Sequence, residues 1–180
     1  ATPATPESLG WEVAAAMAER RGWPAAGVLG GRLYVCGGRD EQREPLSSVE
    51  CLATGCSIWE PVAPMAGQRA GAAAASVMGR LYVCGGAFGV QMLSSAERFD
   101  PKDGVWETLP SMSSRRAYVA AAAVAGRLHV FGGSGGGQVP EPRHQCMCSA
   151  EQFDPGVGEW SALPALSERR SGAAAISVLA

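Results

Sequence analysis

The 180-residue sequence predicts an all-β fold, part of a β-propeller, because it is built from repeats. A tryptophan stands ten residues before an arginine four times: Trp11, Trp59, Trp106 and Trp160 precede Arg21, Arg69, Arg116 and Arg170. Glycine pairs follow the first three tryptophans by 26 residues, at Gly37-Gly38, Gly85-Gly86 and Gly132-Gly133. A period of 48 and then 47 residues is too long for helical hairpin arrays and fits one four-stranded propeller blade.

Each repeat predicts four strands. The run Leu33 to Cys36 has no polar alternation, as expected for a strand buried on both faces between neighbouring blades. The alanine runs favour helix by propensity, but the repeat context places them as inner strands, where blades converge and only small side chains fit. The predicted inner strands are 24–30, 72–78, 119–125 and 173–179. The second strands are 32–36, 80–84 and 127–131, the third are 48–52, 95–99 and 149–153, and the outer ones are 11–14, 58–62, 105–109 and 159–163.

Three repeated features are predicted to be structural. The glycine pairs end the second strands, where a Cβ would block a turn or a close backbone approach. Glu50, Glu97 and Glu151 each precede the next tryptophan by nine residues, and we interpret these glutamates and Trp59, Trp106 and Trp160 as structural. Only the segment from the second glycine to the glutamate varies in length, by 12, 11 and 18 residues.

The repeats do not add up to a closed ring. Residues 1–10 are predicted to be a disordered or extended lead, and 11–180 a propeller segment. Complete blades are expected at about 21–65, 69–112 and 116–166, with partial blades at 11–17 and 170–180. Propellers have about four to eight blades. We therefore expect further blades or a second copy of the chain to close the ring, since the open sides would expose apolar patches.

The repeat resembles the kelch motif, on four matching elements over residues 11–180. They are the glycine pair after an LYV strand, the segment AERFDP, the tryptophan with a following proline, and the arginine that opens the next repeat. Among kelch proteins, the sequence is similar to the BTB-kelch substrate adaptors. The resemblance implies a kelch propeller that recognises a partner or substrate peptide, as in the substrate receptor of a cullin-type ubiquitin ligase.

Composition excludes several function classes. The net charge of −2 and 18% charged residues do not favour nucleic acid or an anionic membrane as a partner. No apolar run approaches the roughly 18 residues of a membrane span.

The six cysteines indicate a reducing, cytoplasmic environment, with Cys36 and Cys84 in the core. The segment His144 to Cys148 holds zinc-type ligands but lacks the spacing of common structural sites, so we predict no metal and no cofactor.

The sequence does not predict an enzyme. The glycine-rich segment 132–136 matches G-x-S-x-G, but that motif needs a strand-to-helix elbow with a histidine partner, and this one follows a second strand. His129 takes the place held by Tyr34 and Tyr82, which favours a packed aromatic substitute over a general base. No recognisable triad, carboxylate pair or phosphate loop is present.

Binding is expected at one face. Because strands alternate in direction, the variable loops 39–48, 87–94 and 134–148 should share a face with the links that carry the repeat arginines, and loops on a rigid scaffold commonly carry recognition. In kelch-like adaptors, arginines before the inner strand grip acidic peptides. The resemblance therefore implies partner contacts for Arg21, Arg69, Arg116 and Arg170, with Phe88 and His144 as loop candidates.

Two alternatives remain open. The arginines could instead tie each link to a neighbouring carbonyl or to the repeat glutamate, and the chain could be a scaffold subunit without a specific peptide site. If the arginines line the binding surface, the double variant Arg69→Ala/Arg116→Ala should lose an acidic-peptide partner and remain folded. The expected partner is another protein or an acidic peptide segment.

Overall fold

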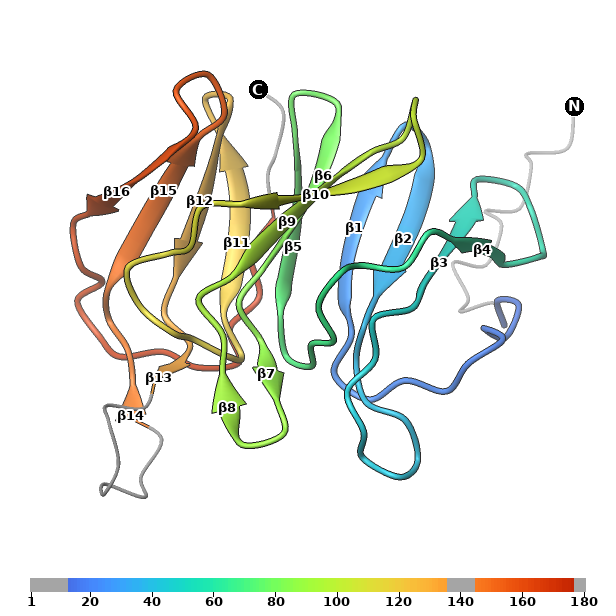
Figure 1. Ribbon diagram of the computed structural model, residues 1–180, viewed down its shortest axis with the longest axis horizontal. Coiled ribbons are helices and arrows are strands. Elements are labelled where there is room, and N and C mark those ends of the chain that lie inside the picture. Colours follow the sequence, from blue (N-terminus) through green and yellow to red (C-terminus); the bar gives the residue numbers. More distant parts are fainter. Residues whose placement is uncertain (1–12, 136–144, 177–180) are drawn as a thin grey trace, which may run out of the picture.

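The structure is a computed structural model that describes residues 13–135 and 145–176. Three four-stranded antiparallel sheets stand side by side as blades (Figure 1). The first contains β1 (Ala25–Leu29), β2 (Arg32–Cys36), β3 (Val49–Ala53) and β4 (Glu60–Val62). The second contains β5 (Ala73–Val77), β6 (Arg80–Cys84), β9 (Ala96–Asp100) and β10 (Val105–Leu109). The third contains β11 (Ala120–Val124), β12 (Arg127–Phe131), β15 (Ala150–Asp154) and β16 (Glu159–Leu163).

Each blade is a meander in which successive long strands pair from the inside outward. In the second blade, Val83 on β6 lies opposite Ala74 on β5 and Glu97 on β9. The two middle strands of each blade thereby pair their backbone groups on both sides, whereas the inner and outer strands pair on one side. This arrangement confirms the predicted all-β, partial propeller.

The hydrophobic core consists of the layers between blades. Tyr34 and Cys36 of the first blade cluster with Leu81 and Val83 of the second. The equivalent pairs Tyr82–Cys84 and Leu128–Val130 make the layer between the second and third blades. Among the described blades, β6 in the middle is therefore covered on both faces, whereas β2 and β12 are covered on the face toward the second blade. This burial explains the continuous apolar sequence of the second strands.

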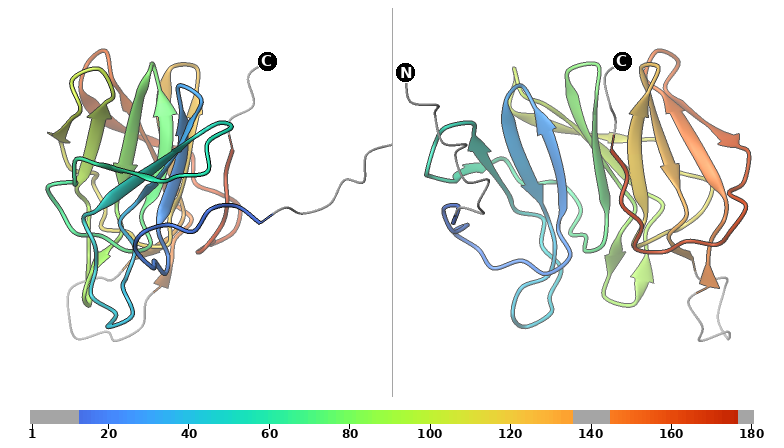
Figure 2. Two further views of the ribbon diagram at one scale, coloured as in Figure 1. Left: turned by 90° about the vertical axis from the view of Figure 1, so that its right-hand side faces the viewer. Right: turned by 180° about the vertical axis from the view of Figure 1, so that it is seen from behind.

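The inner strands require small residues because they approach each other closely. β1 and β11 each lie beside β5 (Figure 2). A Cβ added to Gly27 would lie 2.7 Å from the Leu81 Cδ1 and 3.6 Å from the Ala74 Cβ. The alanine runs are therefore strands despite their helical propensity, because only small side chains fit between converging sheets.

Two predicted end strands do not form in the described residues. Residues 13–14, within the predicted outer strand 11–14, and residues 173–176, within the predicted inner strand 173–179, are not in strands. A strand needs a ladder with a neighbour, and the described part of the chain offers none at either end. The predicted lead at 1–10 lies outside the described residues.

The variable loops contain two short hairpins that the sequence did not predict. They are formed by β7 (Ala87–Phe88) with β8 (Gln91–Met92) and by β13 (Ser134–Gly135) with β14 (Gln145–Cys146). Both project from the same end of the blades (Figure 1). Within 13–135 and 145–176, no helix is long and apolar enough to cross a membrane.

Candidate functional site: the loop face

The variable loops and the inter-blade links lie together at one end of the blades, which we call the loop face. Backbone bridges join them: Gly22 pairs with Arg39, Ala70 with Ala87, Ala117 with Ser134, and Met147 with Arg170. Figure 1 shows this end at the bottom, with the β7–β8 and β13–β14 hairpins projecting from it. The expectation that strand alternation brings these segments to one face is confirmed.

Arg69 is held in a buried clasp beneath this face. Its Nη2 donates to the Glu97 Oε1 at 2.6 Å, and its Nη1 donates to the Gly85 carbonyl at 2.8 Å and the Ser95 carbonyl at 3.2 Å. Glu97 also accepts the backbone N–H groups of Ala66 and Gly67, at 2.7 and 3.0 Å. The guanidinium and carboxylate thus join the link, the second strand and the third strand of one blade.

The clasp recurs in the other two blades. Arg116 donates to the Glu151 Oε1 at 2.7 Å and to the Gly132 carbonyl at 3.0 Å. Arg21 donates to the Glu50 Oε1 and to the Gly37 carbonyl, both at 3.0 Å. The spacing between arginine, glycine pair and glutamate therefore has a direct structural cause.

The same arginines connect each blade to the one before it through their backbone. The Gly38 N–H donates to the Arg69 carbonyl at 2.9 Å, and the Gly86 N–H donates to the Arg116 carbonyl at 2.9 Å. A Cβ on Gly85 would come within 2.5 Å of the Arg116 carbonyl oxygen, so this position excludes other side chains. The glycine pairs thus lie where two blades meet at backbone distance, and the glutamates hold the buried arginines.

Three of the four predicted binding arginines are therefore inaccessible. The side chains of Arg21, Arg69 and Arg116 are 1%, 1% and 0% exposed. A partner could reach them only by breaking a buried ion pair, so the geometry is that of the structural alternative. Arg170 differs: its side chain is 56% exposed and contacts only Glu168, at 3.3 Å, because none of the described residues supplies its repeat glutamate.

The repeat tryptophans also join neighbouring blades. The Trp106 indole donates to the Ala63 carbonyl at 2.7 Å, and the Trp160 indole donates to the Pro110 carbonyl at 2.8 Å. Trp59 donates to the Ala15 carbonyl at 2.9 Å. In the second and third blades, the indole thus binds the segment that follows the outer strand of the preceding blade. In the first blade, Ala15 lies at the corresponding place of the chain.

Besides Arg170, three exposed cations of the loop face stand one residue before the predicted arginines. Arg20, Arg115 and Arg169 each precede a repeat arginine, and all three are exposed. Arg20 pairs with the Glu41 Oε1 at 2.6 Å, and Arg169 lies 3.4 Å from the Gln145 Oε1. No side chain among the described residues pairs with the Arg115 guanidinium. The Arg-Arg doublets could have indicated that the two arginines of a pair differ in exposure, since consecutive residues of an extended link point in opposite directions.

The loop candidates have separate outcomes. Phe88 is half exposed at the turn of the β7–β8 hairpin on this face, next to the exposed Val90. His144 lies outside the described residues. Cys146 and Cys148 are free thiols. Within the described ranges, no group of three His, Cys, Asp or Glu side chains is placed to hold a metal ion.

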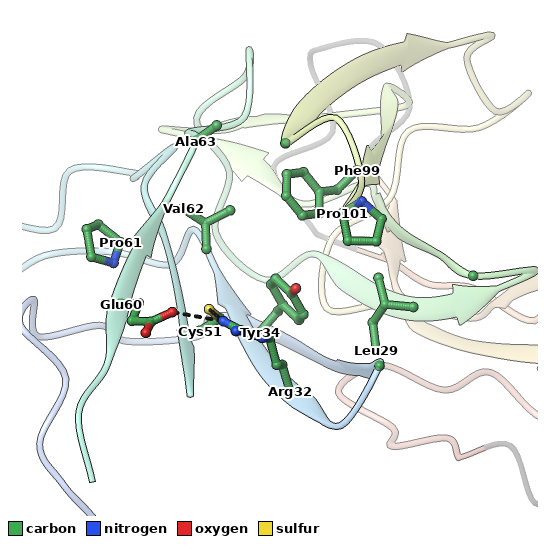
Figure 3. Close-up of a pocket in the computed structure, with 13 residues that line it drawn as sticks. Leu29, Arg32, Tyr34, Cys51, Glu60, Pro61, Val62, Ala63, Phe99 and Pro101 are labelled. Atoms are coloured by element: carbon green, nitrogen blue, oxygen red, sulfur yellow. Dashed lines mark hydrogen bonds and ion pairs between the residues drawn. The ribbon is translucent and has the colours of Figure 1, made fainter. Parts of the chain in front are cut away.

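A cleft of about 690 Å³ opens at the other end of the blades, between the first and second (Figure 3). In the second and third blades, Arg80 pairs with Asp100 and Arg127 with Asp154, each at 2.8 Å. The first repeat has Ala53 in place of the aspartate. Arg32 therefore turns to the Glu60 Oε2 at 2.8 Å and the Cys51 Sγ at 3.6 Å, on the wall of the cleft.

Comparison with known proteins agrees with the geometry. The Kelch motif matches three consecutive segments, residues 21–66, 68–113 and 115–167. Among solved structures, the chain is similar to one titled "Structure of YjhT", with a TM-score of 0.68 and 17% sequence identity. The match covers 82% of this chain and 52% of that one, so this chain spans about half its length. No curated protein matches. Three motif copies that coincide with three clasped blades place this chain in the kelch-repeat family, whose propellers are in general protein-binding modules.

Proposed function

We propose that this chain recognises a partner protein at its loop face, through an acidic segment that contacts Arg115 and Arg169. The observation that carries the proposal is the different exposure of the two arginines in the doublet 115–116. The second arginine of 115–116 is buried in a clasp, and the first is exposed beside the variable loops. The clasp makes the link rigid, and the exposed guanidinium is thereby held on the loop face.

Charge and geometry favour a carboxylate-bearing partner. Arg115 has no carboxylate among the described residues, and Arg169 has only contacts of 3.4 Å with Gln145 and the Cys146 carbonyl. A guanidinium presents paired donors that match a carboxylate in a bidentate arrangement. Arg20 is less available because Glu41 already neutralises it.

The resemblance to BTB-kelch adaptors supports a finer form of the proposal. In a cullin-type ubiquitin ligase, a chain of this kind would hold the substrate at the loop face. The role is recognition without catalysis, in the cytoplasm. All six cysteines are free thiols, which supports a reducing compartment.

A charge-reversal experiment tests the proposal. The chain and its Arg115→Glu/Arg169→Glu variant are titrated with fluorescein-labelled peptides rich in Asp and Glu, and binding is followed by anisotropy. We expect the variant to bind at least about tenfold more weakly, because two cationic contacts become repulsive. Lys102→Glu is the matched control: this exposed lysine lies in the β9–β10 turn at the other end of the blades.

Circular dichroism establishes that the three proteins are equally folded. Peptides with Lys and Arg in place of the acidic residues should not bind the native chain. If Lys102→Glu weakens binding as much as the double variant, or if no acidic peptide binds, the proposal is wrong. The scaffold alternative, in which the loop face has no specific peptide site, would then be preferred.

A further inference from the structure

One position of the loop face carries large side chains in an unfavourable backbone conformation. The residue two places after each repeat arginine has a left-handed φ: Trp23 (51°), Gly71 (65°), Tyr118 (53°) and Gly172 (69°). Glycine adopts this conformation freely, whereas other residues are disfavoured there. Two repeats have glycine, and the other two carry aromatic residues at the same place.

The backbone itself explains the conformation but not the aromatic side chains. The Gly71 N–H donates to the Trp23 carbonyl at 2.9 Å, and the Tyr118 N–H donates to the Gly71 carbonyl at 2.7 Å. The Gly172 N–H continues the series to the Tyr118 carbonyl at 2.8 Å. This series of backbone hydrogen bonds links all three blades. Two of its four positions hold glycine, so the hydrogen bonds do not require an aromatic residue. An aromatic residue held in a strained conformation therefore calls for another reason, which is often binding.

The two aromatic rings meet above the glycine between them. Trp23 and Tyr118 make an edge-to-face pair, with ring centroids 5.6 Å apart and an interplanar angle of 86°. A Cβ on Gly71 would lie 3.0 Å from the Cδ1 and Cε1 of Tyr118, so the Tyr118 ring covers this glycine. A small residue in the second blade thus permits rings from the first and third blades to touch.

The pair has support on two sides and remains open to solvent. Tyr118 packs against the buried cluster of Ala87, Met92 and Ala117, which includes one residue from each strand of the β7–β8 hairpin. The Arg39 guanidinium lies 5.0 Å from the centroid of the Trp23 ring, a cation–π contact. Nevertheless Trp23 is 57% exposed. We call Trp23, Tyr118 and Arg39 the aromatic platform.

Charge at the platform selects the chemistry of its ligand. Within the described residues no acidic side chain pairs with the Arg39 guanidinium, whose contact is the Trp23 ring. Because a cation already occupies the ring, a lysine or arginine of a partner would be repelled. An aromatic side chain can instead pack on the exposed indole, and a neighbouring carboxylate can bind Arg39. Exposed Trp, Tyr and Arg are also the residues most enriched at the energetic centres of protein interfaces.

We propose that the aromatic platform binds a Phe, Tyr or Trp side chain of a partner segment, next to an Asp or Glu that contacts Arg39. This inference rests on the proposed function, because it identifies part of the same acidic segment. Arg115 and Arg169 contact acidic residues elsewhere in the segment, and the platform takes its aromatic residue.

The variant Trp23→Gly separates binding from folding. It introduces the residue that the chain already has at the equivalent positions 71 and 172, where φ is also left-handed. The substitution removes the exposed indole and relieves the backbone, so the fold should be retained. Val90→Gly is a matched control, because Val90 is an exposed apolar residue of the same face outside the platform.

Binding is measured with three labelled acidic peptides that differ at one position beside a glutamate, which holds Phe, Leu or Ala. The native chain and Val90→Gly should bind the Phe peptide about tenfold more tightly than the Ala peptide, the size expected of one aromatic contact. The Leu peptide should bind no better than the Ala peptide. Trp23→Gly should bind the Phe peptide only as well as the Ala peptide.

The outcomes distinguish this inference from the proposed function. If the native chain binds the three peptides equally, while Arg115→Glu/Arg169→Glu still weakens all of them, the platform is wrong and the proposed function stands. Equal tightening by Phe and Leu would also overturn it, in favour of a merely apolar surface. If no peptide binds, both proposals fail. A preference for Phe that survives in Trp23→Gly would exclude the platform as its cause.

Discussion

The repeat arginines are residues whose burial decides their role. Arg69 and Arg116 lie among backbone carbonyls and one carboxylate each, with almost no exposed surface. Taking either partner away leaves the other as an uncompensated buried charge, which is far more costly than losing an exposed ion pair. The clasp is thus a requirement of the fold, irrespective of what the loop face binds.

The first prediction concerns this burial. Arg116→Ala should lower the free energy of unfolding by about 3–5 kcal/mol, because Glu151 is left buried without its counter-ion. Arg127→Ala removes an exposed pair with Asp154 and should cost less than about 1 kcal/mol. Urea denaturation measures both. We accordingly expect Arg69→Ala/Arg116→Ala to unfold, contrary to the expectation from sequence. Similar losses for Arg116→Ala and Arg127→Ala would contradict the role of the clasp.

A second prediction at this scale is a pH dependence. Burial on its own raises the pKa of the Glu50 carboxyl, but the Ala18 N–H, the Arg21 guanidinium and the Glu19 N–H outweigh it, so the pKa is lowered overall. A carboxyl with a lowered pKa stabilises the fold above its unfolded pKa of about 4.3, and this stability is lost as the pH falls through the folded value.

Glu50→Gln isolates this contribution. At pH 7 the variant should have a lower free energy of unfolding than the native chain, and the difference should shrink as the pH falls below about 4. Lowered pKa values of Asp100 and Asp154 also contribute to acid sensitivity, but they are common to both proteins and cancel in the difference. A difference that stays constant between neutral and acidic pH would show that ionised Glu50 does not stabilise the clasp.

At the scale of elements, the glycine pairs decide how one blade meets the next. Each pair follows a second strand and receives the link to the neighbouring blade at backbone distance. A position can require glycine for two separate reasons: a left-handed φ, or another backbone that approaches too closely for a Cβ. Some positions of this chain have only the left-handed φ. Gly85 has both, whereas Gly104 has a φ of 70° with no atom within 4 Å of its would-be Cβ.

Alanine substitutions at Gly104 and Gly85 distinguish the cost of the left-handed φ from the cost of the close backbone approach. Gly104→Ala should cost about 1–2 kcal/mol, the price of a left-handed alanine. Gly85→Ala should cost at least about 2 kcal/mol more, because its Cβ would meet the Arg116 carbonyl oxygen. Thermal and urea unfolding give both values. Equal destabilisation would mean that the blades separate easily, and that the close approach is not a constraint.

At the scale of the whole molecule, the blades differ in how completely they are covered. Leu33, Leu81 and Leu128 occupy the same position of the second strand. Leu81 and Leu128 are 0% exposed because each packs against the blade before it, whereas Leu33 is 37% exposed. Stability is therefore concentrated in the two layers between described blades, as expected when repeats contact only their neighbours.

Matched truncations test this distribution. Leu81→Ala should lower the free energy of unfolding by about 2–5 kcal/mol, since it leaves a cavity between two blades. Leu33→Ala should lower it by less than half as much, because the side chain is already partly in water. Chemical denaturation of the two variants decides the matter. Equal losses would show that something covers the outer side of the first blade in solution.

Much of the fold could be predicted because its constraints are local and periodic. The three second strands have the predicted bounds, since a glycine pair ends each one. The third strands are shifted by one residue, to 49–53, 96–100 and 150–154, because turn chemistry marks a strand end less sharply. The hairpins in the variable loops have no repeat and were not foreseen.

The sequence by itself determined the repeat, the blade and the face that carries the loops, because backbone geometry and strand alternation act at fixed spacing. Only the tertiary structure decided that Arg21 and Arg116, the second arginines of their doublets, are buried, whereas Arg170 is exposed. It alone also brought together Trp23 and Tyr118, whose rings meet across a glycine of the blade between them. A repeated residue is equally compatible with a clasp and with a binding surface, and the choice depends on which way its side chain points relative to the neighbouring blade.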